Sequence, residues 1–169
     1  PSVLVAEQFG KEGMLRLKGK ALARSPPKAI PSLFSCSGFA FSKSSVIKDV
    51  PYDPHLPFLF FGEETLMNVR LWTSGYDFFA PPINVCFHVW ERTYRHNFRE
   101  IKLEGREEME RKSLDRIKYL LKLCDSQDSE VCIEAEKYGL GSERTLQEWQ
   151  EFTGVDLRAR NISEKAKWG

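Results

Sequence analysis

One stretch of the sequence has the pattern of a buried helix: Glu63-Glu64-Thr65-Leu66-Met67-Asn68-Val69-Arg70-Leu71-Trp72-Thr73-Ser74-Gly75. Its apolar residues are dense enough to predict a mostly buried helix from Glu63 to Trp72. They are Leu66, Met67, Val69 and Leu71. Glycine in the left-handed conformation commonly ends a helix, so Gly75 predicts where this one stops. The two glutamates fall in the first turn, where the helix dipole favours negative charge.

The residues before this helix predict extended and turning chain. Pro51-Tyr52-Asp53-Pro54, followed by Pro57, cannot be helical and predicts a rigid approach to the helix. Upstream, Leu33 to Phe41 combines small and aromatic residues on what we expect to be extended chain, and Met14 to Leu17 alternates like a short strand. Gly38 marks either the close approach of a ligand or a glycine needed for packing.

After the helix, two short runs have the character of strands, Tyr76 to Ala80 and Ile83 to Val89. From about Phe98 the pattern becomes helical and strongly charged. One apolar stripe predicts the first of these helices: Leu114, Ile117, Leu121 and Cys124.

Two more helices are predicted beyond this stripe. One runs from Ser129 to Tyr138 and stops at Gly139. Thr145-Leu146-Gln147-Glu148 is a capping box that begins the other, and Gly154 ends it. The sequence therefore predicts an α+β structure over the first two-thirds of the chain, followed by helices.

The composition excludes several classes of protein. An apolar fraction of 41% and a charged fraction of 29% are typical of a globular domain. A net charge of +1 argues against a chain held on nucleic acid by its overall field. The longest apolar run, Leu56 to Phe61, is far shorter than the roughly 20 residues of a membrane helix, so we expect no membrane segment.

Four cysteines, Cys36, Cys86, Cys124 and Cys132, lack metal-ligand spacing. We expect them to be small buried hydrophobic residues that stay reduced. The sequon Asn161-Ile162-Ser163 matters only in a secretory lumen. The localisation is therefore open, with the cytoplasm favoured and the Golgi lumen as the alternative.

Glu63 and Glu64 are the first candidates for chemistry. Neighbouring side chains on a helix point in different directions, so we do not expect the two to share one substrate as an acid/base pair. One could turn toward a site and accept hydrogen bonds from hydroxyls, while the other caps the helix or pairs with Arg70. Alternatively, both acids serve only the helix dipole.

His88 lies late in the second strand-like run, and a basic cluster follows it: Arg92, Arg95, His96 and Arg99. Arginine forks suit phosphate oxygens, and a histidine nitrogen can bind a divalent ion. His88 is therefore either a metal ligand or a structural, hydrogen-bonded histidine.

Several stretches together resemble one family. They are Pro51-Tyr52-Asp53-Pro54, Leu59-Phe60-Phe61-Gly62-Glu63-Glu64, Arg70-Leu71-Trp72-Thr73-Ser74-Gly75-Tyr76-Asp77 and Val85-Cys86-Phe87-His88-Val89-Trp90-Glu91-Arg92, with Tyr138 to Leu146 and Phe152 to Asp156 near the end. In this order, over residues 13 to 156, they resemble a family of GlcNAc-transferases. It attaches N-acetylglucosamine (GlcNAc) to hydroxyproline of a cytosolic ubiquitin-ligase adaptor, or to Thr or Ser of secreted proteins in some protists.

The resemblance implies a GT-A fold, in which a Rossmann-like nucleotide-sugar domain continues into an acceptor-binding half. The fold class would be α/β to α+β. Residues 1–97 would then be the C-terminal, acceptor-side part of the catalytic domain. Residues 98–169 would be a small helical extension packed on it.

The resemblance also implies substrates and site residues. The donor would be UDP-GlcNAc, the acceptor a polypeptide hydroxyl, and the cofactor a divalent ion, manganese, with His88 as its ligand. Glu63 or Glu64 would lie beside the transferring hexose as the catalytic carboxylate, next to Gly62. Substrate contacts would come from Ser37, Gly38 and Phe39, and from Arg92 and Arg95 at the diphosphate or the acceptor.

One departure from the family is large. Its D-x-D motif, which binds the ion and the UDP diphosphate, occurs nowhere in this chain. A divalent ion held by one histidine without a carboxylate pair would bind weakly. Because the chain also starts without Met, we expect it to be the C-terminal portion of a transferase, inactive alone and active in its longer parent.

Two alternatives remain from the sequence. The chain could be a non-catalytic peptide- or glycan-binding module derived from the same fold. It could also be a hydrolase that uses Glu63 and Glu64, although glycosidase carboxyls flank the scissile bond at roughly 5 Å or more, which adjacent residues do not favour.

Overall fold

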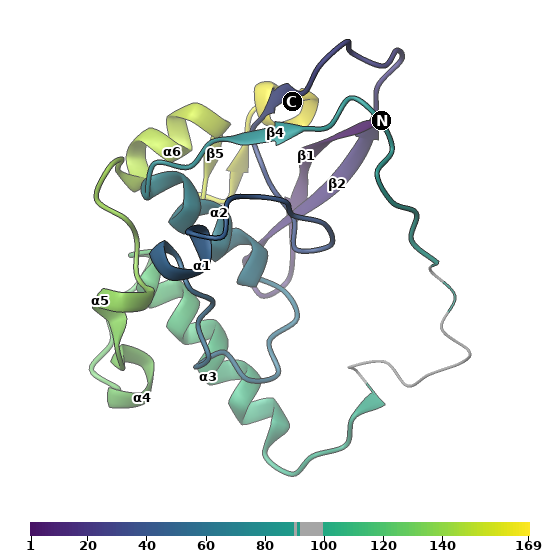
Figure 1. Cartoon of the computed structure of the whole chain (residues 1–169). Helices are drawn as coiled ribbons and strands as arrows, with labels where there is room; N and C mark the ends of the chain where they lie inside the picture. The colour runs from purple at the N-terminus through teal and green to yellow at the C-terminus, as the bar shows by residue number, and fades with distance from the viewer. Residues whose placement is uncertain (90, 92–99) are drawn as a thin grey trace.

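The computed structural model describes residues 1–89, 91 and 100–169. In these residues, helices pack around and between three two-stranded antiparallel sheets (Figure 1). The elements in chain order are β1 (Ser2–Phe9), β2 (Leu15–Ala21), β3 (Ile30–Ser32), α1 (Val46–Asp49), α2 (Glu63–Thr73), β4 (Phe78–Ala80), α3 (Arg106–Leu120), α4 (Ser129–Cys132), α5 (Ala135–Tyr138), α6 (Leu146–Thr153), β5 (Val155–Asp156), β6 (Asn161–Ile162) and α7 (Glu164–Trp168).

The β1–β2 hairpin forms one side of the molecule. Its turn is closed by a hydrogen bond from the Gly10 N–H to the Met14 carbonyl, 2.9 Å, and Gly13 has a φ of 83° that favours glycine. The register shifts between Ala6 and Gln8, which marks a β-bulge. The strand β2 confirms the strand predicted around Met14 to Leu17.

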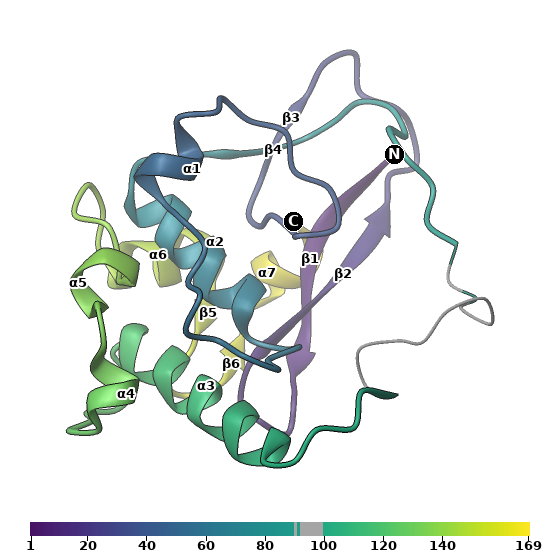
Figure 2. The ribbon, with the colours of Figure 1, turned by 60° about the horizontal axis from the view of Figure 1, so that its bottom comes forward.

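Helix α2 is the central helix. In both ribbon views it lies between the β1–β2 hairpin on one side and α5 and α6 on the other (Figures 1 and 2). Most of its residues are buried, including Leu66 and Val69. Gly75, with a φ of 90°, follows its end. The predicted helix and its glycine stop are therefore confirmed.

The hydrophobic core joins residues from both ends of the chain. Trp149 of α6 is fully buried and meets Phe34 edge to face, with ring centroids 6.4 Å apart. Phe152, one turn further, stacks on Trp72 of α2 at 5.4 Å. Residues after 98 therefore pack on residues before 97 through a shared cluster of apolar side chains.

The C-terminal helices follow the sequence prediction in part. The Thr145–Glu148 capping box and the left-handed Gly154 both occur, so α6 is confirmed. The single helix predicted over Ser129 to Tyr138 is wrong, because it is broken into α4 and α5. Glu134, at the break, has a φ of 46°, and its carboxylate receives hydrogen bonds from His55 and Lys137 at 2.9 and 3.1 Å.

Two predicted extended segments are also wrong. The chain from Leu33 to Phe41 leaves β3 and turns at Ser37 and Gly38, and Ile83 to Val89 contains no strand. The apolar residues of the second segment are exposed, Phe87 by 88%, because no neighbouring strand in the described part of the chain completes a sheet with it.

The cysteines are all free, as expected, but Cys86 and Cys124 are exposed rather than buried. None of the helices described in the structure is long and apolar enough to cross a membrane.

Candidate functional site

The two glutamates at the start of α2 meet the loop that follows β3. The Ser37 backbone N–H donates to Glu64 Oε1 at 2.9 Å, and the Ser37 hydroxyl donates to Glu63 Oε2 at 3.0 Å. The structure thus brings Ser37, which the family resemblance implied, next to Glu63 and Glu64, which the sequence singled out as a pair. Consecutive helical residues diverge, and here a single serine lies between them, presenting its N–H to one carboxylate and its hydroxyl to the other.

Neither glutamate caps α2 or pairs with Arg70, so this part of the prediction is wrong. The N-cap residue is Gly62, which provides no side chain. The Arg70 guanidinium is buried and donates to the Pro51 carbonyl at 2.8 Å and the Gly139 carbonyl at 3.2 Å. The other part of the prediction, that one carboxylate accepts a hydrogen bond from a hydroxyl, fits Glu63, which accepts from the Ser37 hydroxyl.

Asn68 fixes the same loop one turn further along α2. Its Oδ1 accepts from the Ser35 N–H, and its Nδ2 donates to the Ser35 carbonyl, both at 2.8 Å. The Nδ2 also donates to the Glu64 carbonyl at 2.8 Å. Because residues four apart lie on one helix face, Glu64 and Asn68 hold successive parts of the loop.

A small hollow opens between this loop and the helix. Ser37, Tyr52, Glu64 and Asn68 contribute to its lining, together with Met67. Its volume is about 30 Å³, against the roughly 300–1,000 Å³ of pockets that enclose small ligands. A ligand larger than a water molecule must therefore lie across the mouth of the hollow rather than inside it.

The electrostatics of the site favour a proton on Glu63. Partial burial raises the pKa of Glu63, and the nearby Glu64 charge raises it further, while the Ser37 hydrogen bond and the Arg70 charge lower it. Among the described residues, its buried Oε1 atom has no hydrogen-bond partner. The pKa of Tyr52 is also raised, by burial first and then by the Glu63 and Glu64 charges.

Side chains of α2 and α3 hold the segment that carries Tyr52 in place. Asp53 forms an ion pair with Arg116 of α3 at 2.7 Å, and each side chain is only 1% exposed. The Ser113 hydroxyl, on the same helix, donates to the Pro57 carbonyl at 2.8 Å. With the Arg70 bond to Pro51, these contacts fix the backbone on both sides of Tyr52.

The two glycines of the predicted site have different roles. A Cβ atom at Gly62 would lie 2.9 Å from Met14 Cγ and 3.1 Å from Ile117 Cδ1, and Gly62 has a φ of 116°. Its requirement for glycine is therefore structural. Gly38 is exposed, and a Cβ there would meet only Cys36 Sγ, at 4.0 Å. Gly38 is not a packing glycine, and its neighbour Phe39 is 46% exposed.

No cluster of metal ligands surrounds the predicted ligand His88 among the residues that the structure describes. His88 is exposed, in the segment that forms no strand. Among the described residues, no group of three His, Cys, Asp or Glu side chains could hold a metal ion. The described residues by themselves therefore do not fit a manganese site. Arg92 and Arg95 lie outside the described residues.

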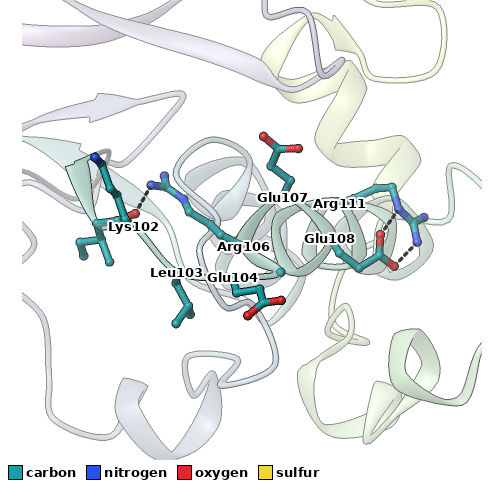
Figure 3. A pocket seen from close by; sticks show the side chains of 9 residues that line it. Lys102, Leu103, Glu104, Arg106, Glu107, Glu108 and Arg111 are labelled. Atoms are coloured by element: carbon teal, nitrogen blue, oxygen red, sulfur yellow. Dashed lines mark hydrogen bonds and ion pairs between the residues drawn. The ribbon is translucent and has the colours of Figure 1, made fainter.

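A second hollow, about 840 Å³, lies before and along the first turn of α3 and includes none of the predicted site residues (Figure 3). Its lining contains three basic and three acidic side chains: Lys102, Arg106, Arg111, Glu104, Glu107 and Glu108. Arg111 pairs with Glu108 at 2.6 Å, and Arg106 donates to the Ile101 carbonyl at 2.9 Å. This surface has no excess charge to select a ligand.

Sequence reasoning missed Asn68, Tyr52 and the Asp53–Arg116 pair. Asn68 is polar, lies between Met67 and Val69 and follows Glu64 by four residues, so its place on the same helix face could have been noticed in the sequence. Tyr52 lies in the proline-bounded turn, but only its neighbours in the structure indicate that it belongs to the site. Asp53 and Arg116 are 63 residues apart and carry no local signal.

Two carboxylates that accept from a hydroxyl and an amide, beside an exposed aromatic ring, define a site suited to a ligand rich in hydroxyl groups. A family model described as Glycosyltransferase (GlcNAc) matches residues 1–159, so the chain belongs to this glycosyltransferase family. No curated protein and no solved structure is significantly similar to it.

Proposed function

We propose that this chain forms the acceptor-side part of an enzyme that transfers GlcNAc from UDP-GlcNAc to a hydroxyl of a polypeptide, in hydroxyproline, Thr or Ser. Membership of the family supports glycosyl transfer in general. The observation that supports the placement of the site is the pair of carboxylates, Glu63 and Glu64, facing the Ser37 hydroxyl and N–H.

Each residue has a role in this proposal. The Ser37 contacts show that the carboxylates are placed to accept hydrogen bonds from an O–H and an N–H. Sugar hydroxyls would bind Glu64 across the mouth of the hollow. Glu63, with its raised pKa and one buried oxygen that accepts no hydrogen bond from the described residues, would hold a proton close to the transferring group. Gly38 would let the sugar or the acceptor approach the backbone.

Metal dependence belongs to the proposal as well. A divalent ion would stabilise the departing diphosphate, and His88 is the one ligand we assign to it. Since the described residues offer no cluster of ligands around it, the other ligands would have to come from elsewhere in the active protein.

The second candidate function is a non-catalytic module that binds a glycan or a peptide. The small volume of the hollow favours it. It shares the ligand-binding residues and differs in lacking turnover.

The test is UDP release from UDP-GlcNAc with manganese and an acceptor peptide, using the full-length protein that contains this chain. We expect release that depends on the metal and falls strongly in His88→Ala. Release that persists in this variant would keep the enzyme class and remove the assignment of His88. Binding of the sugar without any release would support the non-catalytic module.

A further inference from the structure

Tyr52 is exposed at the edge of the candidate site. Its side chain is 64% exposed, and it lines the same small hollow as Ser37 and Glu64. Its hydroxyl has no hydrogen-bond partner among the described residues. Exposed aromatic side chains are common on protein surfaces, and what distinguishes Tyr52 is its place beside the two carboxylates, since it lines the hollow with Glu64 and interacts electrostatically with Glu63 and Glu64.

The backbone that carries Tyr52 is more rigid than that of an ordinary exposed loop. The preceding carbonyl, of Pro51, receives the buried Arg70 guanidinium at 2.8 Å. The following residue, Asp53, is held by the buried Arg116 at 2.7 Å and also accepts the His55 N–H at 2.9 Å. Prolines at 51 and 54 restrict φ on either side. A side chain on such a base loses little backbone freedom when a ligand binds.

The combination matches the two chemical faces of a hexopyranose. A sugar ring has hydroxyl groups around its edge and C–H groups on its faces. Carboxylates accept hydrogen bonds from the hydroxyls, and an aromatic ring packs against the C–H groups. At about 30 Å³ the hollow cannot enclose a hexose, so a sugar bound to Glu64 must extend over the mouth, where Tyr52 lies.

We infer that Tyr52 contacts the pyranose ring of the sugar and selects a hexose at this site, while Glu63 and Glu64 bind its hydroxyls. This inference rests on the proposed function, since it assigns a residue to the sugar of that reaction. The Asp53–Arg116 pair acts through Tyr52 by positioning it and does not touch the sugar.

The test is saturation-transfer NMR on the whole chain with methyl N-acetylglucosaminide as the probe. We expect saturation transfer from protein aromatic protons to the C–H protons of the sugar. In Tyr52→Ala the dissociation constant should rise by about three- to tenfold, the range given by one aromatic contact. Tyr52→Phe keeps the ring and should bind like wild type.

Phe79→Ala is the matched control. Phe79 is an aromatic residue with a similar exposure, 61%, on β4, and it does not line the hollow. We expect this variant to bind the sugar like wild type. An equal loss in Phe79→Ala and Tyr52→Ala would mean that any exposed ring contributes, and would overturn the inference.

The outcomes separate this inference from the proposed function. Sugar binding that is equal in wild type and Tyr52→Ala, but lost in Glu64→Gln, overturns the role of Tyr52 and leaves the proposed function standing. No sugar binding by the wild-type chain also overturns the inference, and UDP release by the full-length protein then decides the function independently. If Tyr52→Ala weakens only an acceptor peptide, the ring binds the acceptor and the inference is wrong.

Discussion

Experiments can distinguish the role of Gly38 from that of Gly62, although in the sequence both are small residues near the predicted site. We predict that Gly38→Ala leaves the free energy of unfolding unchanged, because the new Cβ meets only Cys36 Sγ at 4.0 Å. A larger substitution, Gly38→Val, should lower transfer without unfolding the protein if a ligand approaches this backbone. Urea denaturation and UDP release measure the two effects.

Gly62→Ala is the contrasting case. We predict a loss of about 1–3 kcal/mol, because the residue has a φ of 116° and its Cβ would lie 2.9 Å from Met14 Cγ. A variant as stable as wild type in urea would show that α2 can begin without glycine at this position.

The raised pKa of Glu63 predicts a pH dependence of stability. A carboxyl whose folded pKa exceeds its unfolded value binds its proton more tightly when folded, so its contribution is fully present below the unfolded pKa and is lost as the pH rises through the folded pKa. Glu63→Gln keeps an acceptor for the Ser37 hydroxyl and removes this charge. We therefore expect it to be more stable than wild type at pH 7.5.

At pH 4, below the ordinary glutamate pKa of 4.5, the advantage of Glu63→Gln should disappear. Urea denaturation of both proteins at the two pH values provides the comparison. An advantage that grows as the pH falls would have the wrong sign and would show that burial does not raise this pKa.

The buried ion pair between the proline-bounded segment and α3 should matter more than the exposed pairs on the same helix. Removing Asp53 leaves the Arg116 charge uncompensated in a site where both side chains are 1% exposed. We predict that Asp53→Ala costs about 3–5 kcal/mol of unfolding free energy.

Arg111→Met is the control on α3, because Arg111 pairs with Glu108 and Asp115 at the surface. Its stability should stay close to that of wild type. If both variants lose the same amount, the Asp53–Arg116 pair does not anchor the segment that carries Tyr52.

Among the elements, those with local signals could be predicted and those that depend on distant partners could not. Helix α2 follows from its apolar density, and α6 from Thr145, Glu148 and Gly154, which act within one turn. The segment Ile83 to Val89 alternates like a strand, yet strands need partners, and no partner in the described residues pairs with it. A local pattern therefore predicts that a segment tends to form a strand, but not whether it pairs with another strand in a sheet.

The C-terminal stretch that resembles the family has a structural explanation. Around Glu143 and Arg144 the backbone N–H groups donate to the Thr73 carbonyl at 2.9 and 3.1 Å, and Gly141 donates to the Thr73 hydroxyl at 2.9 Å. These bonds satisfy the end of α2, the helix that begins with the candidate carboxylates. The tail thus fixes the site helix from its far end.

Across the whole molecule, the residues before 97 and after 98 share one core, which predicts that they unfold together. Trp149 of α6 is fully buried against Phe34, so Trp149→Ala should cost about 3–5 kcal/mol and lower the single unfolding midpoint. Trp168→Ala, which removes a 64% exposed ring, should stay near wild type. Two separate transitions in wild type, with only one moved by Trp149→Ala, would contradict a shared core.

The sequence predicted several residues of the candidate site, but not how they are arranged in space. Glu63, Glu64, Ser37 and Gly38 could be singled out from the sequence, but their meeting depends on a loop that turns at Ser37 and on Asn68, which holds it. The structure does not show the predicted metal ligand or the predicted diphosphate contacts at this site. His88 is exposed and is not part of a ligand cluster among the described residues. Arg92 and Arg95 lie outside the described residues. Long-range geometry, which no periodicity encodes, accounts for this difference.

We propose that Glu64, where the Ser37 loop meets α2, takes part in GlcNAc transfer, and a comparison of three proteins tests this role. GlcNAc transfer from UDP-GlcNAc to a hydroxyl-bearing peptide would be measured for the full-length protein, for Glu64→Gln and for Glu107→Gln. Glu107 lies in the first turn of α3, so it matches Glu64 in its place on a helix but lies outside the site. We predict that kcat/KM falls by about 10- to 100-fold in Glu64→Gln, because a hydrogen bond to a charged acceptor becomes a neutral one, and that it is unchanged in Glu107→Gln. Equal activity of all three proteins would contradict the claim.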